Sequence, residues 1–357
     1  MCIALITTAH PSYALIILDN RDEFILRPTS LPHWWTSVNN NQQVLSSRDL
    51  LRPEQGTWLG ITKSGNFAVL TNFRETDDPL HPIQGLKSRG GMVTAWLGAE
   101  EEVDTATFVR RLFEDGGVKG VGGFSLVAGK LRRDGAGGIE PLAVISNRSG
   151  GVEDVPWIAG ERDQVHGLSN TSFHDPKVWP KVRMGKEMIS AITEQAANER
   201  WDEEKLVNAL FQALDTDTLP PAKEDEAFEE YLSQLRESVF IPPIGSENPD
   251  EIPEADVIAA AKPIENGHAT HGDVKLINAT KEAEKAKNFM SGVYGTQRQT
   301  IILVDWDGKV TFRERALYDE YGKPIERGHG DQKFEFKIEG WEGKFNGCLR
   351  TRGVEML

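Results

Sequence analysis

Two apolar runs near the N-terminus place the strongest constraint on how this chain folds. They cover residues 3–9 and 13–18 and meet at the turn-forming group Ala9-His10-Pro11-Ser12, which predicts a β-hairpin. A polar cluster, residues 19–23, directly follows the second run. Because unpaired buried polar groups cost several kcal/mol, these side chains need partners. The hairpin returns them to the start of the chain, beside residue 2.

Cys2 follows the first methionine and is small enough for that methionine to be removed. The processed chain would then begin with a thiol and a free α-amino group, whose pKa of ~7.7–8.0 lets it accept the proton of its own side chain. A carboxylate such as Asp22 would hold the ammonium or orient the thiol, and Arg21 would favour a thiolate. The alternative interpretation is that Cys2 is only a small apolar residue tolerated at this position.

Several motifs resemble those of the transport and Golgi organisation protein 2 family, within the NRDE superfamily. The first is the signature Asn20-Arg21-Asp22-Glu23, which follows a Met-Cys-Ile start. The others are Gly56-Thr57-Trp58-Leu59-Gly60, Leu70-Thr71-Asn72-Phe73, Gly167-Leu168-Ser169-Asn170, Trp179-Pro180-Lys181-Val182, and Tyr294-Gly295-Thr296 leading into Ile301-Ile302-Leu303-Val304-Asp305. They occur in the family's order over residues 1–338, which makes the resemblance more specific than the signature alone.

Strands at both ends of the chain, with helices between and after them, predict an α+β fold of stacked antiparallel sheets flanked by helices. The resemblance implies more, namely the four-layer αββα sandwich of N-terminal nucleophile hydrolases. Residues 1–338 are expected to form one domain. Residues 242–288, with their prolines and glycines and few large apolar residues, are predicted to be a flexible insertion, and residues 339–357 a loosely ordered tail.

Local patterns predict the remaining elements. Residues 27–41 are expected to be irregular, with Trp34 and Trp35 either packed under a long loop or forming a stacking wall for a flat ligand. Hairpins are predicted over 56–73 and 300–313, single strands over 124–131, 142–146, 165–169 and 333–338, and helices over 88–98, 105–113, 177–198, 202–214 and 226–240.

The resemblance also implies roles for particular residues. In related cysteine amidases, such as bile salt hydrolases and penicillin V acylases, the terminal cysteine is accompanied by an aspartate, two asparagines and an arginine. Carried over to this sequence, Cys2 is the nucleophile and Asp22 orients its amine or thiol. Asn72 would donate an amide hydrogen to an oxyanion, and Asn170 matches the second asparagine.

The arginine of this set is Arg298. The family motif reads Tyr-Gly-Thr-Arg, whereas here Gln297 stands between Thr296 and Arg298. A one-residue shift in a strand turns a side chain to the other face. Whether Arg298 faces the pocket is therefore left open by the sequence.

Composition excludes some classes of partner and location. The net charge is −15, and 17 acidic against 4 basic residues between Glu199 and Asp256 supply −13 of it; a nucleic-acid surface is therefore not expected. Two cysteines, Cys2 and Cys348, indicate no disulfide framework and favour a reducing compartment. No apolar run is long enough to span a membrane. A cytosolic protein, peripheral to an organelle such as the Golgi or a mitochondrion, is predicted.

Three functions fit these features. The first two, which the resemblance implies together, are carriage of heme or of a lipid or acyl-CoA and a trafficking role in Golgi organisation and secretion. In a heme carrier, Cys2, His10 or His33 is a candidate heme ligand. The alternative is an N-terminal cysteine hydrolase that cleaves an amide or thioester through an acyl-Cys2 intermediate. No cofactor is required by either. His268 and His271 lack further ligands at clear spacing, so no metal site is predicted.

Overall fold

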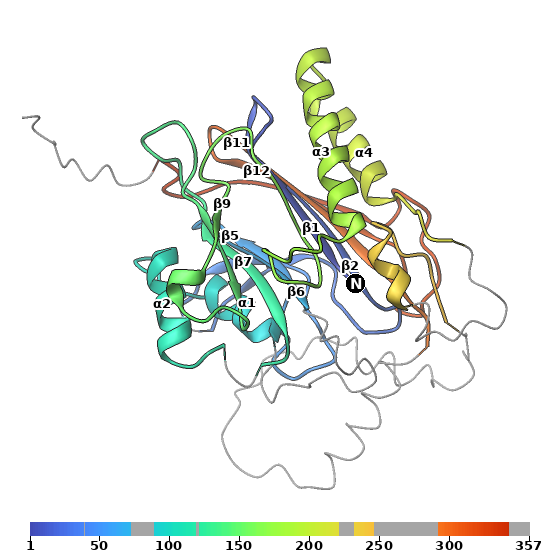
Figure 1. Ribbon diagram of the computed structural model, residues 1–357, viewed down its shortest axis with the longest axis horizontal. Helices are drawn as coiled ribbons and strands as arrows, with labels where there is room; N and C mark the ends of the chain where they lie inside the picture. Colours follow the sequence, from blue (N-terminus) through green and yellow to red (C-terminus); the bar gives the residue numbers. More distant parts are fainter. Residues whose placement is uncertain (39, 73–88, 119–120, 221–231, 246–291, 343–357) are drawn as a thin grey trace, which may run out of the picture.

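The computed structural model describes residues 1–38, 40–72, 89–118, 121–220, 232–245 and 292–342 (Figure 1). Within these residues, two antiparallel β-sheets lie face to face, and helices cover the outer face of each sheet. The layer order is therefore helices, sheet, sheet, helices, which confirms the predicted α+β fold and its αββα arrangement.

The first sheet contains the N-terminus and the signature. Its order is β10 (Val165–Leu168), β1 (Ile3–Thr7), β2 (Tyr13–Phe24), β11 (Tyr294–Asp305), β12 (Lys309–Ala316) and β13 (Asp331–Lys337). Strands β1 and β2 form the predicted hairpin. The signature does not follow the second strand, as the sequence suggested, but lies inside it, because pairing with β11 continues to Phe24.

The second sheet has the order β3 (His33–Thr36), β4 (Gln43–Ser46), β5 (Leu59–Thr62), β6 (Asn66–Asn72), β7 (Phe124–Lys130), β8 (Leu142–Ser146) and β9 (Trp157–Ile158). The expected irregularity of residues 27–41 was thus wrong for β3, which contains both tryptophans. Trp35 donates to Ser46 Oγ at 2.9 Å, and the Trp34 ring meets the edge of Phe336 at 5.0 Å. Both tryptophans therefore pack within the fold.

Along β1 and β2, alternate side chains pack in two different layers of the core. Ala4, Ile6, Leu15 and Ile17 lie between the sheets, whereas residues of the opposite parity face the helices: Ile3, Leu5, Ile16 and Leu18. A side chain of this size stabilises the fold by ~1.5–3 kcal/mol when fully buried. Period-two apolarity on both faces is what a sheet covered on both sides requires.

Within the described ranges, two α-helices cover each sheet. Helices α1 (Arg89–Leu97) and α2 (Thr105–Glu114) pack on the second sheet, and α3 (Pro180–Glu199) and α4 (Glu203–Leu214) pack on the first. Asp104 and Asp202 cap α2 and α4 through their carboxylates. Helix α3 begins with Pro180, whose fixed φ suits a first helical position. Its start lies beside the N-terminus of the chain (Figure 1).

Three sequence predictions fail or fall partly outside the described residues. The helix expected over 226–240 is only a 3-10 turn, Leu232–Arg236, where it is described. Val239 and Ile241 beyond it are buried in irregular backbone. Most of the predicted insertion, with His268 and His271, lies outside the described residues. So do residues 343–357, but Trp341 is buried in the core between the sheets, so ordered packing extends beyond residue 338.

None of the helices in the described part of the chain is both long enough and apolar enough to cross a membrane.

Candidate functional site

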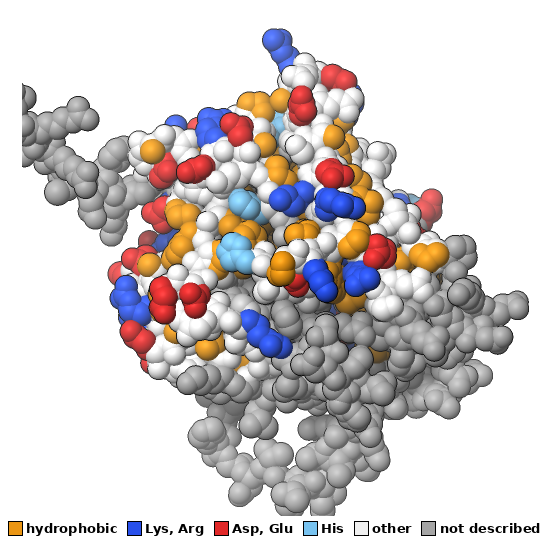
Figure 2. Space-filling model, in the orientation of Figure 1, with side chains coloured by type: hydrophobic (Ala, Val, Ile, Leu, Met, Phe, Trp, Pro, Cys, Tyr) orange, Lys and Arg blue, Asp and Glu red, His pale blue; other side chains and the backbone are white. Residues whose placement is uncertain are grey.

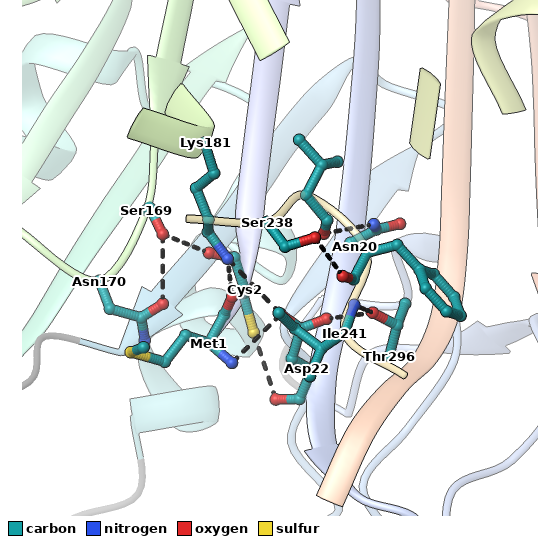
Figure 3. A network of polar contacts seen from close by, with 12 residues as sticks. Met1, Cys2, Asn20, Asp22, Ser169, Asn170, Lys181, Ser238, Ile241 and Thr296 are labelled. Carbon is teal, nitrogen blue, oxygen red and sulfur yellow. Dashed lines mark hydrogen bonds and ion pairs between the residues drawn. The ribbon is translucent and has the colours of Figure 1, made fainter. Parts of the chain in front are cut away.

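The start of the chain is buried against Asp22. The ammonium of Met1 lies 3.1 Å from Asp22 Oδ2 and also donates to the Tyr294 hydroxyl. The other carboxylate oxygen, Oδ1, accepts a hydrogen bond of 2.7 Å from Thr296 Oγ1. Figure 3 shows Met1 and Thr296 converging on the Asp22 side chain. The carboxylate thus has a cation on one oxygen and a hydroxyl on the other.

Lys181 brings a second cation to the same carboxylate. Its side chain is fully buried, its Nζ lies 3.6 Å from Asp22 Oδ2, and it donates to the carbonyl of Met1 (Figure 3). The residue sits in the first turn of α3. Gly185, one turn further on, allows this close approach, since a Cβ there would lie 2.9 Å from Leu5 of β1. Burial lowers the pKa of Lys181, and Asp22 opposes that change.

The Cys2 thiol contacts the backbone of Asp22, whereas the two cations contact its carboxylate. Its Sγ lies 3.7 Å from the backbone oxygen of Asp22, and the Cys2 carbonyl accepts 2.7 Å from Ser169 Oγ. Burial raises the pKa of the Cys2 thiol to about 11; the terminal ammonium lowers it, and Asp22 and Asp19 raise it. With Met1 in place the thiol is therefore protonated at neutral pH, and it needs a base to react.

The two predicted asparagines occupy neighbouring segments. Asn170, buried, follows Ser169, whose Oγ lies 3.5 Å from Asn170 Oδ1. Thr71 Oγ1 donates to the Ser169 carbonyl at 2.8 Å, which ties the end of β6 to this segment. Asn72 is the last residue of β6. Among the hydrogen bonds between described residues, none joins the Asn72 side chain to Cys2, so only Asn170 is tied to the cysteine through a shared partner.

Arg298 lies on the opposite face of the sheet from Asp22. Gln297 forms a bulge, so that Thr296 pairs with Asp22 whereas Arg298 pairs with Arg21. Because paired residues share a face and consecutive residues alternate, Thr296 and Arg298 point to opposite faces. Arg298 Nη2 donates to Thr29 Oγ1 at 3.1 Å. The extra residue noted in the sequence is thus absorbed by the bulge.

The other three signature residues support the fold. Asn20 donates to the carbonyls of Leu214 and Val239 at 2.8 and 3.0 Å. Arg21 lies 4.3 Å above the Trp58 ring and donates to Gln297 Oε1, and Glu23 lies 3.5 Å from Arg27. The expected effect of Arg21 on the thiol does not appear, because its guanidinium is engaged with these groups. Only Asp22 contacts the terminus.

Sequence reasoning missed four polar residues of this site. They are Ser169, Lys181, Tyr294 and Thr296. All four lie inside motifs that carried the family resemblance, but no role was attached to them. Their occurrence in those motifs was the available signal.

A pocket lies beside Ser169, between β10 and the start of α3. Its volume is about 100 Å³, and its lining combines apolar side chains with His166 and Lys186. Figure 2 shows histidine, basic and hydrophobic side chains together on this side of the molecule. This volume is smaller than the ~300–1,000 Å³ usual for small-molecule sites. A heme would not fit within it without rearrangement.

The histidines suggested as heme ligands are not near Cys2. His10 lies in the turn after β1, at the end of the strand opposite Cys2, and its ring packs at 5.0 Å from that of Tyr13. His33 is exposed and contacts the Leu31 carbonyl at 2.9 Å. Within the described residues, no group of three His, Cys, Asp or Glu side chains has the spacing of a metal site.

Sequence comparisons agree on one family. The family described as Transport and Golgi organisation 2 matches residues 1–319. A mouse protein named Transport and Golgi organization 2 homolog is 29% identical over 315 residues, covering 87% of this chain and 88% of the mouse protein. A human homolog of the same name is 28% identical, covering 87% and 88%. An uncharacterized yeast protein, from Saccharomyces cerevisiae, is 26% identical, covering 95% of this chain and 100% of the yeast protein.

Solved structures are more distant. A Caenorhabditis elegans ortholog of N-acylethanolamine-hydrolyzing acid amidase is 12% identical, with a TM-score of 0.38, covering 58% of this chain and 85% of its own. The C2A mutant of the conjugated bile acid hydrolase from Clostridium perfringens is 10% identical, with a TM-score of 0.33, covering 96% and 94%.

Proposed function

This chain belongs to the transport and Golgi organisation 2 family, and we propose that it is an N-terminal cysteine hydrolase that cleaves an amide or thioester. One observation carries the proposal. Asp22 binds the terminal ammonium through its carboxylate and the Cys2 thiol through its backbone oxygen, at 3.1 and 3.7 Å. The Cys2 thiol is thereby held at the same buried residue as the ammonium of Met1, and removal of Met1 leaves the terminal amine on Cys2 itself. That is the pairing that nucleophilic catalysis by a terminal cysteine needs.

The reaction takes Cys2 as the first residue of the processed chain. Its α-amino group accepts the thiol proton, and the sulfur forms a bond to the substrate carbonyl carbon. The bond from that carbon to the leaving nitrogen or sulfur breaks, and the leaving group takes the proton from the amine. Water then hydrolyses the acyl-Cys2 thioester, which releases a carboxylic acid and restores the thiol. Asn170 is the candidate donor to the oxyanion formed in each half.

Mass spectrometry of the intact protein tests this proposal. The native N-terminus is read first, to establish that Met1 is absent. An electrophilic acyl probe is then expected to add to Cys2 in the wild-type chain and not in Cys2→Ala. Cys348→Ala removes the other cysteine and is expected to label fully. Processed wild-type protein that takes up no probe at Cys2 would contradict the proposal.

Carriage of heme, a lipid or an acyl-CoA remains a second candidate. The pocket beside Ser169 supports the lipid or acyl-CoA form of this candidate and not the heme form, because its apolar lining residues suit part of an acyl chain and Lys186, also in the lining, suits an anionic group. A fluorescent acyl-CoA and hemin are to be titrated separately, with Lys186→Glu as the comparison. Saturable binding weakened by Lys186→Glu would support a carrier, and no saturable binding of either ligand would refute it.

We further propose a cytosolic protein that associates peripherally with the Golgi, or with mitochondria, and contributes to Golgi organisation and secretion. The names of the mouse and human relatives support the Golgi part. Fractionation of cells that express the tagged protein tests the location. Recovery in Golgi or mitochondrial fractions that salt washing releases would support it. Recovery in the soluble fraction alone would contradict it.

A further inference from the structure

Met1 is held like a bound ligand rather than like a chain end. Its ammonium binds Asp22 Oδ2 at 3.1 Å and the Tyr294 hydroxyl, and its carbonyl accepts a hydrogen bond from Lys181. The residue is 7% exposed, whereas chain ends usually lie free at the surface. Both polar ends of an α-amino acyl group are therefore recognised, each by a buried side chain.

The side chain of Met1 fills an apolar site. It clusters with Leu235 and Ile241, both fully buried, and partly buried side chains close the site: Trp179, Leu219, Ile244 and Tyr294. This lining suits an unbranched apolar chain of methionine's length. A polar chain would lose its water without gaining a partner there.

Lys181 is costly to keep where it is. It is a cation in the first turn of α3, where the helix dipole disfavours positive charge, and its side chain is fully buried. Its contacts are Asp22 and the Met1 carbonyl. A buried cation that breaks two rules of local stability is typical of a functional residue. Its Nζ donates a hydrogen bond to the carbonyl of Met1, whose carbon is bonded to the Cys2 nitrogen.

We propose that the processed protein acts on substrates whose acyl part is an α-amino acid with an unbranched apolar side chain. In this structure Met1 stands in for that acyl group. Asp22 and Tyr294 take the substrate ammonium, Lys181 its carbonyl, and the cluster around Leu235 its side chain. The inference rests on the proposed hydrolase function, since it requires Met1 to be gone and Cys2 to be terminal.

Chemically, this makes the substrate an aminoacyl amide or thioester with a free amino group. The Cys2 sulfur bonds to the aminoacyl carbonyl carbon, and the carbon–nitrogen or carbon–sulfur bond breaks. The thiol proton passes through the Cys2 amine to the leaving group. Water then releases the free amino acid, so no oxidant or further reactant is needed.

Calorimetric binding to Cys2→Ala tests the substrate class without turnover. Alanine also permits removal of Met1, which mass spectrometry confirms beforehand. L-methioninamide is the probe and is expected to bind. L-glutaminamide, of equal length but polar, and N-acetyl-L-methioninamide, which lacks the ammonium, are each expected to bind at least about tenfold more weakly. In this background Lys181→Met is expected to abolish binding, while the surface variant Lys205→Met leaves it unchanged.

A matched variant keeps Met1 in the proposed aminoacyl site and so blocks it. Cys2→Asn has a side chain too large for methionine removal, so Met1 stays and L-methioninamide is expected not to bind. Equal binding of L-methioninamide and L-glutaminamide would overturn the substrate class. So would no binding of L-methioninamide to Cys2→Ala, even if acyl probes label Cys2 in the wild type; the hydrolase would then stand. Selective binding with no labelling would support the ligand class and refute hydrolysis.

Discussion

The two faces of strands β2 and β11 carry buried charges in opposite states of pairing. On the helix-covered face, Asp22 has two cations at 3.1 and 3.6 Å. On the face between the sheets, neither carboxylate oxygen of Asp19 has a hydrogen-bond partner in the described part of the chain. Burial raises the pKa of Asp19 well above its usual range, and Asp22 and Glu314 raise it further. Asp22 thus has cations within ion-pair distance, whereas burial and the neighbouring carboxylates favour the protonated form of Asp19.

Glu314 lies on the same face but differs from Asp19, because its carboxylate accepts hydrogen bonds from Ser47 Oγ and Thr300 Oγ1. Thr300 pairs with Asp19 on one side and with Glu314 on the other, so the three form a row across the sheet. Burial also raises the pKa of Glu314, against the opposing effect of Arg298. Asp19 and Asp22 are both buried, but only Asp22 has cations at 3.1 and 3.6 Å. These are the Met1 ammonium and Lys181 of α3.

Asp22→Asn is the sharpest way to break this comparison. It removes the negative charge but leaves the buried cation of Lys181 and the terminal ammonium without a counter-ion. Breaking a buried ion pair in this way costs about 3–5 kcal/mol. Urea unfolding at pH 7 measures the change in free energy of unfolding. Asp19→Asn, on the same strand and as deeply buried, is the control; an equal loss in both variants would contradict the distinction between the faces.

The thiol provides the next largest effect. With Met1 retained, the pKa of Cys2 is raised to about 11, whereas an ordinary cysteine has a pKa of ~8.5. Iodoacetamide is therefore expected to alkylate Cys2 about two orders of magnitude more slowly than free cysteine near neutral pH. The rate should rise until pH approaches about 11. A Cys348→Ala background, made with methionine aminopeptidase inhibited, isolates Cys2.

The processed form of that protein is the comparison. Its α-amino group belongs to Cys2 and can accept the thiol proton, so alkylation is expected to be fast at neutral pH. Equal rates in the two forms, each verified by mass spectrometry, would show that the terminal amine does not act on the thiol.

Lys181→Met separates catalysis from stability. Removing one partner of a buried ion pair costs about 3–5 kcal/mol when the other charge is left unpaired. Asp22 keeps the terminal ammonium in Lys181→Met, so this variant is expected to lose less free energy of unfolding than Asp22→Asn. Removing a donor to a reacting carbonyl costs about 10²-fold in kcat. Steady-state hydrolysis of an aminoacyl amide measures the second effect. A large stability loss with unchanged kcat would make Lys181 structural only.

The sequence predicted the sheets better than the site, for a physical reason. Hairpins and helices leave local periodic patterns, so the start of the chain and most helices were placed correctly. The signature was misjudged because its polar residues interrupt the apolar pattern while the backbone continues as β2. Trp34 and Trp35 were misplaced because their strand is short and at an edge, with packing partners far along the chain.

The site depended on contacts between distant segments. Asp22 could be predicted because the hairpin returns it to residue 2. Lys181 could not, because it reaches the terminus only when α3 docks on β1, and that docking depends on the missing side chain of Gly185. The sequence left open which face of the sheet Arg298 occupies, because that face depends on a bulge at Gln297 that no local pattern specifies.

Asp19→Asn is expected to give the smallest effect, and its pH dependence tests the proton that Asp19 is inferred to hold. A carboxyl whose pKa is raised on folding stabilises the protein below its unfolded pKa of ~3.9, and this contribution is lost as pH rises through the folded pKa. Asparagine carries no such penalty. The variant is therefore expected to match wild type near pH 4 and to exceed it by about 1–2 kcal/mol at high pH. Urea unfolding between pH 4 and 9 measures this, with Asp307→Asn in an exposed turn as the control. A variant less stable than wild type at high pH would mean that Asp19 is charged and paired, and the contrast between the two faces would be lost.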